Sequence, residues 1–207
     1  MTWFLRNWTD IAYALWEHIA ISLTALTIAF ALSLLIGIVA ARRERLYGTV
    51  MTISGFLYTI PTLAFLAFLI PFVGLGRTNA IITMVAFSLM ILIRSVATGI
   101  REVPAEVIDA ARGMGMNAAQ IMRRIELPLA LPLIVAGLRV SAVTVISVTV
   151  VAAYVNAGGL GTLIFNGIAS DHPAKIWAGA LTACALAVSV DLLLALVERQ
   201  LKRRRAA

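Results

Sequence analysis

The sequence predicts an all-α, polytopic membrane protein with five transmembrane helices, and three observations support this fold class. Hydrophobic residues make up 61% of the 207 residues and charged residues only 13%, whereas an ordinary soluble domain carries about 25% charged residues. The mean hydropathy is +0.97. The apolar residues also form uninterrupted stretches, and about 20 such residues let a helix cross the hydrocarbon core of a bilayer.

Five stretches of this length divide the chain, which we expect to form a single transmembrane domain over residues 1–207. The stretches are residues 19–41, 49–73, 79–100, 129–155 and 177–197. Pro61 and Pro71 in the second stretch and Pro132 in the fourth predict kinks or early helix ends, because proline lacks the backbone N–H that a helix uses.

A separate helix at the membrane surface is predicted before the first span. Trp8, Ile11 and Leu15 recur at helical spacing, and Thr9 can cap the start of a helix. Tryptophan favours the headgroup boundary of a membrane. We therefore expect an interfacial helix over residues 8–18.

Positively charged residues are concentrated on one side of the predicted spans. That side carries Arg42, Arg43, Arg45, Arg101, Arg112, Arg123, Arg124, Arg199, Lys202, Arg203, Arg204 and Arg205, and the other side carries Arg6, Arg77 and Lys175. Because arginine and lysine in short loops stay in the cytoplasm, the N-terminus is predicted outside and the C-terminus inside. The net charge of +7 is thus a topology signal, and the basic C-terminal end is expected to meet lipid headgroups rather than nucleic acid.

The cytoplasmic segment 101–128 is too polar to enter the bilayer. Gly115 can interrupt a helix, and Asn117 and Gln120 have the spacing of a reciprocal capping box that restarts it. Pro128 is expected to stop this second helix. The pattern predicts two short helices joined by a glycine bend, which is either a solvated connection or a functional loop.

A spaced motif within this segment distinguishes the two interpretations. Its members are Asp109, Ala110, Ala111, Gly115, Ile125, Leu127 and Pro128. Their spacing resembles the EAA loop of binding-protein-dependent ABC importer permeases, although Asp109 stands where the family more often has glutamate. The resemblance implies a type I importer permease fold in which these residues form a coupling loop, over residues 101–128, that docks into a cytoplasmic ATPase.

Two further stretches, residues 58–76 and 153–168, resemble the osmoprotectant branch of that family, which imports glycine betaine, choline, carnitine and related quaternary ammonium solutes. With them the similarity covers about residues 19–200. It implies the permease subunit of an ATP-driven importer in a bacterial or archaeal plasma (inner) membrane. The implied partners are a cytoplasmic ABC ATPase dimer, an extracytoplasmic solute-binding protein and a second copy of the permease or a related permease.

No cofactor is expected on this chain, and the chain is expected not to be an enzyme. It lacks the glycine–lysine loop that cradles nucleotide phosphates, so ATP and Mg²⁺ are expected on the partner ATPase. No metal site or catalytic cluster is expected either. His18 and His172 fall outside the predicted spans, and Cys184 has no partner within one helical turn.

The candidate residues for a solute path are Tyr58, Pro61, Ser141, Thr144, Ser147, Tyr154 and Asn156. The three hydroxyl residues advance by three positions each, and this stripe either lines the path or hydrogen-bonds to a neighbouring helix. The two tyrosines and Trp177 either contact a quaternary ammonium group or anchor the chain at the interface. Residues 154–176 are expected to form an extracytoplasmic loop, with or without a short helix.

Three charged residues, Arg94, Arg139 and Asp191, fall inside predicted spans. A charge at the centre of a spanning helix costs about 2.5–3.5 kcal/mol on insertion scales. Asp191 follows small residues at four-residue steps, so it is expected to face another helix rather than lipid. We expect Asp191 to pair with Arg139 or Arg94 in a structural bridge.

The sequence leaves alternatives open for the assembly of the chain and for its function. Small residues recur at four-residue steps from Ala25 to Ala41, and this face allows close approach of a helix from the same chain or from a second permease. Since five spans are few to enclose a path, we expect a dimer. The alternative functions are an ABC permease for methionine or another amino acid, and an ion-coupled carrier, which would place more ionisable groups at the midplane.

Overall fold

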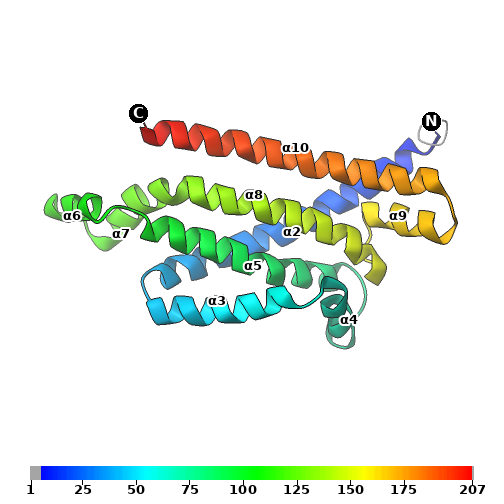
Figure 1. The fold of residues 1–207 in the computed structure, drawn as a ribbon, viewed down its shortest axis with the longest axis horizontal. Coiled ribbons are helices and arrows are strands. Elements are labelled where there is room, and N and C mark those ends of the chain that lie inside the picture. The colour runs from blue at the N-terminus through cyan, green and yellow to red at the C-terminus, as the bar shows by residue number, and fades with distance from the viewer. Residues whose placement is uncertain (1–5, 207) are drawn as a thin grey trace.

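The computed structural model describes residues 6–206, with the backbone alone for residues 204–206. Within this part of the chain, four helical segments are individually long and apolar enough to cross a membrane. They contain α2 (Trp8–Ala41), α5 (Arg77–Arg101), α8 (Leu127–Ala152) and α10 (Pro173–Ala206). These helices run lengthwise beside one another, and the two ends of the chain lie at opposite ends of the bundle (Figure 1).

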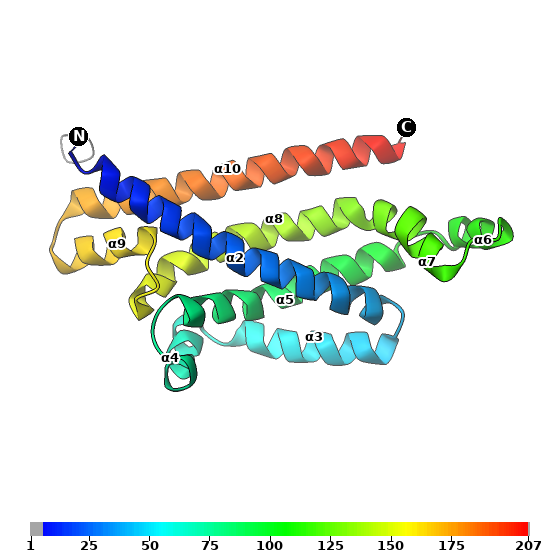
Figure 2. The same ribbon diagram turned by 180° about the vertical axis from the view of Figure 1, so that it is seen from behind.

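The second predicted span is broken in the middle. It consists of α3 (Glu44–Thr59) and α4 (Thr62–Val73), which are bent by 99° at the break. The bend lies where Pro61 was expected to disturb the helix, because the residue before a proline avoids the helical conformation and Ile60 has ψ of 129°. The helix α3 rises only about 24 Å, while α4 turns across the end of the bundle (Figure 2). With this bent pair counted as one span, the described residues form the five spans that the sequence predicted.

The interfacial helix expected over residues 8–18 is not a separate element. It is the beginning of α2, which continues for 34 residues. Its outer face carries Trp8 and Trp16, which are about two-thirds exposed, while Ala14 and His18 on the inner face are buried. His18, predicted to lie before the first span, is thus part of the same continuous helix as that span.

Pro128 does not end the helix of the cytoplasmic segment. The short helix α7 (Ala118–Ile121), a π-helical turn η1 (Met122–Glu126) and α8 form a continuous helical segment up to Val155. Pro128 occupies the first turn of α8, where a missing N–H is tolerated. Pro132 lies inside α8 and does not end it. The cytoplasmic segment therefore leads directly into a membrane-spanning helix.

Small residues pack the centre of the bundle. On α2, a Cβ added at Gly37 would stand 2.6 Å from the Val96 side chain of α5. Between α5 and α8, a Cβ added at Gly99 would stand 3.1 Å from the Ala130 Cβ. The small-residue face of α2 is buried from Ala25 to Gly37, and it therefore serves packing within the chain.

A short helix lies between α8 and α10, as the sequence allowed. After the 3₁₀ turn η2 (Ala153–Val155), Asn156 adopts φ of 62°, and α9 (Leu160–Ala169) packs beside the start of α10 (Figure 1). Because α10 begins at Pro173, the connection after α9 is shorter than the loop predicted to end at residue 176.

Two consecutive side chains of α2 hold the turn that precedes α9. The Glu17 carboxylate accepts a hydrogen bond from the Gly159 N–H at 3.2 Å. The His18 Nδ1 accepts one from the Leu160 N–H at 3.3 Å, and its Nε2 lies 3.1 Å from the Ile146 carbonyl oxygen and donates to it. The histidine is completely buried, so its two hydrogen bonds satisfy both ring nitrogens inside the bundle.

Replacing Gly161 by alanine should destabilise this end of the bundle. The new Cβ would stand 2.1 Å from the Val150 carbonyl oxygen, and overpacking of this kind costs about 1–3 kcal/mol. The measurement is the thermal unfolding midpoint of the purified protein in detergent. The matched control is Gly55→Ala on α3, where the new Cβ meets nothing within 4 Å. A midpoint unchanged by Gly161→Ala would contradict the close contact between α9 and α8.

Candidate functional site

The predicted coupling loop forms two short helices and a glycine turn. The helix α6 (Ala105–Gly113) ends just before Gly115, which has φ of +79°. The Asn117 side chain then accepts from the Gln120 N–H at 3.0 Å, and the Gln120 side chain accepts from the Asn117 N–H at 2.8 Å. This capping box starts α7 as the sequence predicted.

The loop projects from the end of the bundle at which α10 finishes (Figures 1 and 2). Arg112, Arg123 and Arg124 are exposed there. Since this concentration of positive charge predicts the cytoplasmic side, α6 and α7 lie where a cytoplasmic partner can contact them.

The seven predicted coupling residues divide into two groups by exposure. Those exposed at the surface are Asp109, Ala110, Gly115 and Pro128, and those buried or half-buried are Ala111, Ile125 and Leu127. Ala111 has no exposed surface, so it packs the loop rather than contacting a partner. Leu127 packs against the buried cluster around Ile134. The inward residues thus attach the loop to the bundle, and the outward residues form its free surface.

One residue of this region was missed by the sequence reasoning. Glu126 lies between two motif positions and is only 2% exposed. Its carboxylate is 2.6 Å from the Arg42 guanidinium of α2. The signal in the sequence was an acidic residue flanked on both sides by apolar ones, at a position that the motif leaves open.

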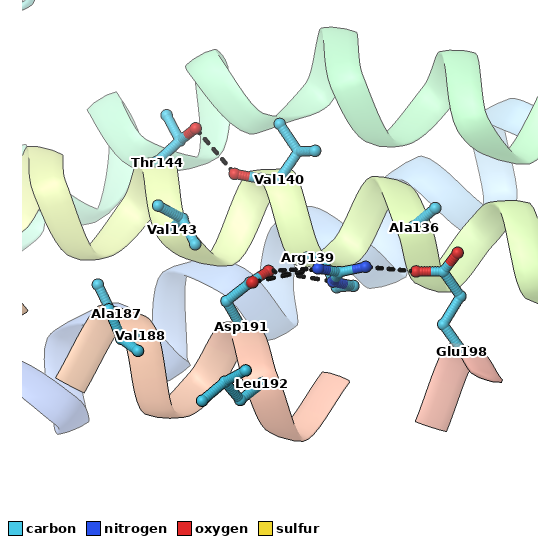
Figure 3. A pocket seen from close by; sticks show the side chains of 10 residues that line it. All are labelled: Ala136, Arg139, Val140, Val143, Thr144, Ala187, Val188, Asp191, Leu192 and Glu198. Carbon is cyan, nitrogen blue, oxygen red and sulfur yellow. Dashed lines mark hydrogen bonds and ion pairs between the residues drawn. The ribbon is translucent and has the colours of Figure 1, made fainter. Parts of the chain in front are cut away.

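A groove of about 680 Å³ runs between α8 and α10 (Figure 3). Its lining residues are Ala136, Arg139, Val140, Val143, Thr144, Ala187, Val188, Asp191, Leu192 and Glu198. Most of the lining is apolar, and the charged side chains gather toward the end nearer the C-terminus. Of the predicted path residues, Thr144 alone lines this groove.

Arg139 is the centre of the charge cluster in the groove. Its Nε lies 3.0 Å from one Asp191 oxygen, and a terminal nitrogen lies 3.1 Å from the other. Its remaining terminal nitrogen lies 2.7 Å from Glu198, which also accepts from Lys202 at 2.5 Å. Of the two partners expected for Asp191, the structure thus places Arg139 against it. Arg94 is exposed, and within the described residues it forms no ion pair.

Comparison with known proteins decides the family. The family described as binding-protein-dependent transport system inner membrane component matches residues 33–203. The chain belongs to this family. It is therefore a transport permease of the inner membrane, with several membrane-spanning helices.

The permease resembles two curated relatives over nearly its whole length. It is 37% identical over 195 residues to the choline transport system permease protein OpuBB of Bacillus subtilis, which covers 94% of the permease and 90% of that protein. It is also 37% identical over 201 residues to the carnitine transport permease protein OpuCB of Listeria monocytogenes, with coverage of 97% and 92%.

A solved structure supports the type I importer permease fold. An inward-facing conformation of the MetNI methionine ABC transporter matches with a TM-score of 0.84 at 23% identity, covering 92% of the permease and 95% of that chain. Membership in an importer family implies that the permease works with an ATPase and a solute-binding protein.

The three hydroxyl residues of the permease differ in exposure. Ser141 is buried, Thr144 is half-buried and Ser147 is exposed. The Thr144 and Ser147 hydroxyls donate to the Val140 and Val143 carbonyls of α8 itself, at 2.9 and 3.0 Å. Neither hydroxyl therefore links α8 to another helix.

The other predicted path residues do not line this groove. The Tyr58 ring meets Phe87 edge-on with centroids 6.1 Å apart, and the Tyr154 ring meets Phe165 at 6.0 Å. Pro61 lies exposed in the bend between α3 and α4, and Asn156 is exposed before α9. Since each tyrosine contacts a different phenylalanine, the structure gives no sign of one aromatic site built from both.

Removing the Asp191 carboxylate should reduce assembly of the permease. The variant Asp191→Asn leaves Arg139 with a weaker partner, and a hydrogen bond to a charged group contributes about 1.5–3 kcal/mol. The measurement is the amount of folded permease extracted from membranes and its thermal midpoint. Arg94→Gln, which removes an unpaired cation, is the matched control. An Asp191→Asn variant that assembles normally yet loses transport would instead place Asp191 in the transport path.

Proposed function

We propose that the permease is the membrane subunit of an ATP-driven importer of quaternary ammonium osmoprotectants such as glycine betaine, choline and carnitine. The observation that carries the proposal is a coupling-type loop projecting from a bundle whose sequence is 37% identical to choline and carnitine transport permeases. The loop supports the ATP-driven class, and the relatives support the solute class.

In the proposed mechanism, an external solute-binding protein delivers the solute to the outer mouth. ATP and Mg²⁺ bind to two cytoplasmic ATPase subunits, whose closure moves α6 and α7. Because α7 continues through η1 into α8, a displacement of the docked loop acts directly on a spanning helix that lines the groove. The spans then tilt from an inward-open to an outward-open arrangement, and the permease itself hydrolyses nothing.

The solute path in this proposal lies between two permeases, either identical or related. The groove between α8 and α10 is open at the side of a single chain. Several apolar side chains of α10 remain more than half exposed, among them Leu181, Val188 and Leu193. A second permease placed against the open side would complete the enclosure, whereas lipid would cover the rest of α10.

Changing the exposed surface of the loop should weaken the functional connection between the permease and its ATPase. In Gly115→Trp a bulky group enters open space, since nothing lies within 4 Å of an added Cβ, and the positive φ strains any side chain by about 1–2 kcal/mol. Asp109→Lys reverses an exposed charge. Both variants should lower solute uptake and transport-stimulated ATP hydrolysis about tenfold, within the usual range of coupling energies.

The assay uses the permease reconstituted with its ATPase and solute-binding protein, and membrane insertion is measured in parallel. The control is Gly48→Trp, an exposed glycine of α3 with equally open surroundings, which should retain uptake. Unchanged uptake in both loop variants would show that the assigned docking role is wrong.

The solute class is tested on the cognate binding protein. Radiolabelled choline and glycine betaine should bind to it, and methionine should not. The reverse result would favour the alternative, an amino-acid importer. Solute movement by the permease alone, with no ATPase present, would instead favour an ion-coupled carrier.

A further inference from the structure

A buried carboxylate lies at the junction between the coupling loop and the spanning helices. Glu126 occupies the last position of the π-helical turn η1, and its side chain is only 3% exposed. An ionised group removed from water in this way requires a partner of opposite charge. Among the described residues, Arg42 provides it, with a guanidinium nitrogen 2.6 Å from the Glu126 Oε2. The two residues are 84 positions apart in the sequence.

Arg42 stands at the last turn of α2 and reaches into the angle of the loop. Its backbone N–H caps α2 through the Val39 carbonyl at 3.3 Å. A small cleft at this place, of about 120 Å³, is lined by Arg42 of α2 together with Ile108 of α6 and Ala118 of α7. The arginine therefore faces this cleft together with residues of both arms of the coupling loop.

The end of α2 is itself bound to its neighbours by Arg101 of α5. The Arg101 guanidinium donates to the Ala40 and Ala41 carbonyls at 3.1 Å each, pairs with Glu44 at 3.0 Å and lies 4.3 Å from the centre of the Tyr47 ring. The end of α2, the start of α3 and the end of α5 thus form one connected unit. The chain joins this unit to α6 through residues 102–104, and the Arg42–Glu126 pair joins it to the other arm of the loop, at η1.

The π-helical turn gives the junction a place to bend. In an otherwise continuous helical segment from Ala118 to Val155, a π turn interrupts the regular hydrogen-bond ladder, and such turns are common at helix kinks and functional sites. A push on α7 is therefore absorbed partly at η1. The other arm of the loop is joined to α5 by the non-helical residues 102–104. A second connection, from the η1 arm, would carry the same displacement to the end of α2.

We propose that Glu126 and Arg42 form this second connection, so that a displacement of the coupling loop moves α2, α3 and α5 together with α8. The inference rests on the proposed function. Both are positioning residues, because in this proposal they act through the helices that they join. An ion pair whose carboxylate is buried contributes little net stability, since desolvation offsets the attraction between the charges. Its effect here is geometric: it holds the loop in one register on the end of α2.

The test uses the complete transporter in proteoliposomes, with permease, ATPase and solute-binding protein. The solute is whichever of radiolabelled choline, glycine betaine or methionine the binding protein binds. The variants are Glu126→Gln, Arg42→Gln, Arg42→Lys and the reversed pair Arg42→Glu with Glu126→Arg. The matched control is Arg43→Gln, an exposed neighbour whose side chain makes no hydrogen bond or ion pair within the described residues. Solute moved per ATP hydrolysed and copurification of the ATPase are measured.

Each glutamine variant should lower the solute moved per ATP about fivefold or more, while the ATPase still copurifies. Arg42→Lys should retain more coupling than Arg42→Gln, because it keeps the charge. The reversed pair should recover most of the wild-type ratio, and Arg43→Gln should match the wild type.

Three results would overturn the inference. The first is a wild-type ratio in both glutamine variants. The second is a reversed pair that moves no more solute per ATP than the single variants. The reversed pair also decides the matter if a single variant fails to insert. The third is an Arg42→Lys variant as poorly coupled as Arg42→Gln. In each case the proposed ATP-driven function stands as long as the wild type needs its ATPase for uptake, so the two failures remain distinguishable.

Discussion

The close approach of α2 and α8 to α5 is the constraint on which the rest of the permease depends. In a bilayer the helices gain no hydrophobic energy by leaving lipid for one another, so they associate through van der Waals packing and hydrogen bonds. Small residues make this packing tight. A Cβ added at Gly37 or Gly137 would collide with Val96 or Ser95 of α5. Because α5 holds both neighbours at this distance, the two ends of the bundle keep a defined geometry.

The two ends use that geometry differently. At the outer end, in the predicted orientation, Glu17 and His18 of α2 hold the turn before α9 by hydrogen bonds to backbone N–H groups. At the inner end, arginines bind the carbonyls of a helix terminus and a buried carboxylate. Each arrangement supplies hydrogen-bond partners to polar groups that the packing of the helices buries. The coupling loop is attached through the second arrangement.

The groove between α8 and α10 has a balanced set of charges. Arg139 and Lys202 are cations, Asp191 and Glu198 are anions, and each carboxylate is within ion-pair distance of a cation. A cationic solute would therefore find no surplus carboxylate among these four residues. The cluster joins α8 to α10, and the apolar part of the groove lies around Val143 and Val188.

The sequence alone was sufficient for the class of fold, because apolar length and charge asymmetry act along the chain and need no knowledge of contacts. The capping box at Asn117 and the bend at Pro61 were predictable for the same reason, since each depends on neighbouring residues. The helix end predicted at Pro128 was wrong, because a rule based on neighbouring residues takes no account of the π turn before it. The predicted end of the interfacial helix at residue 18 was wrong for a similar reason, because this helix continues without a break as α2.

Only the tertiary structure decided which motif residues face outward, which partner Asp191 takes and what Glu126 does. Ala111 and Asp109 are two positions apart in one motif, yet one is buried and the other exposed. Arg42 and Glu126 are distant in the chain and become neighbours only when α2 and α8 pack on α5. Long-range pairing depends on how helices are placed in three dimensions, and the residue spacing within a single helix carries no record of that placement.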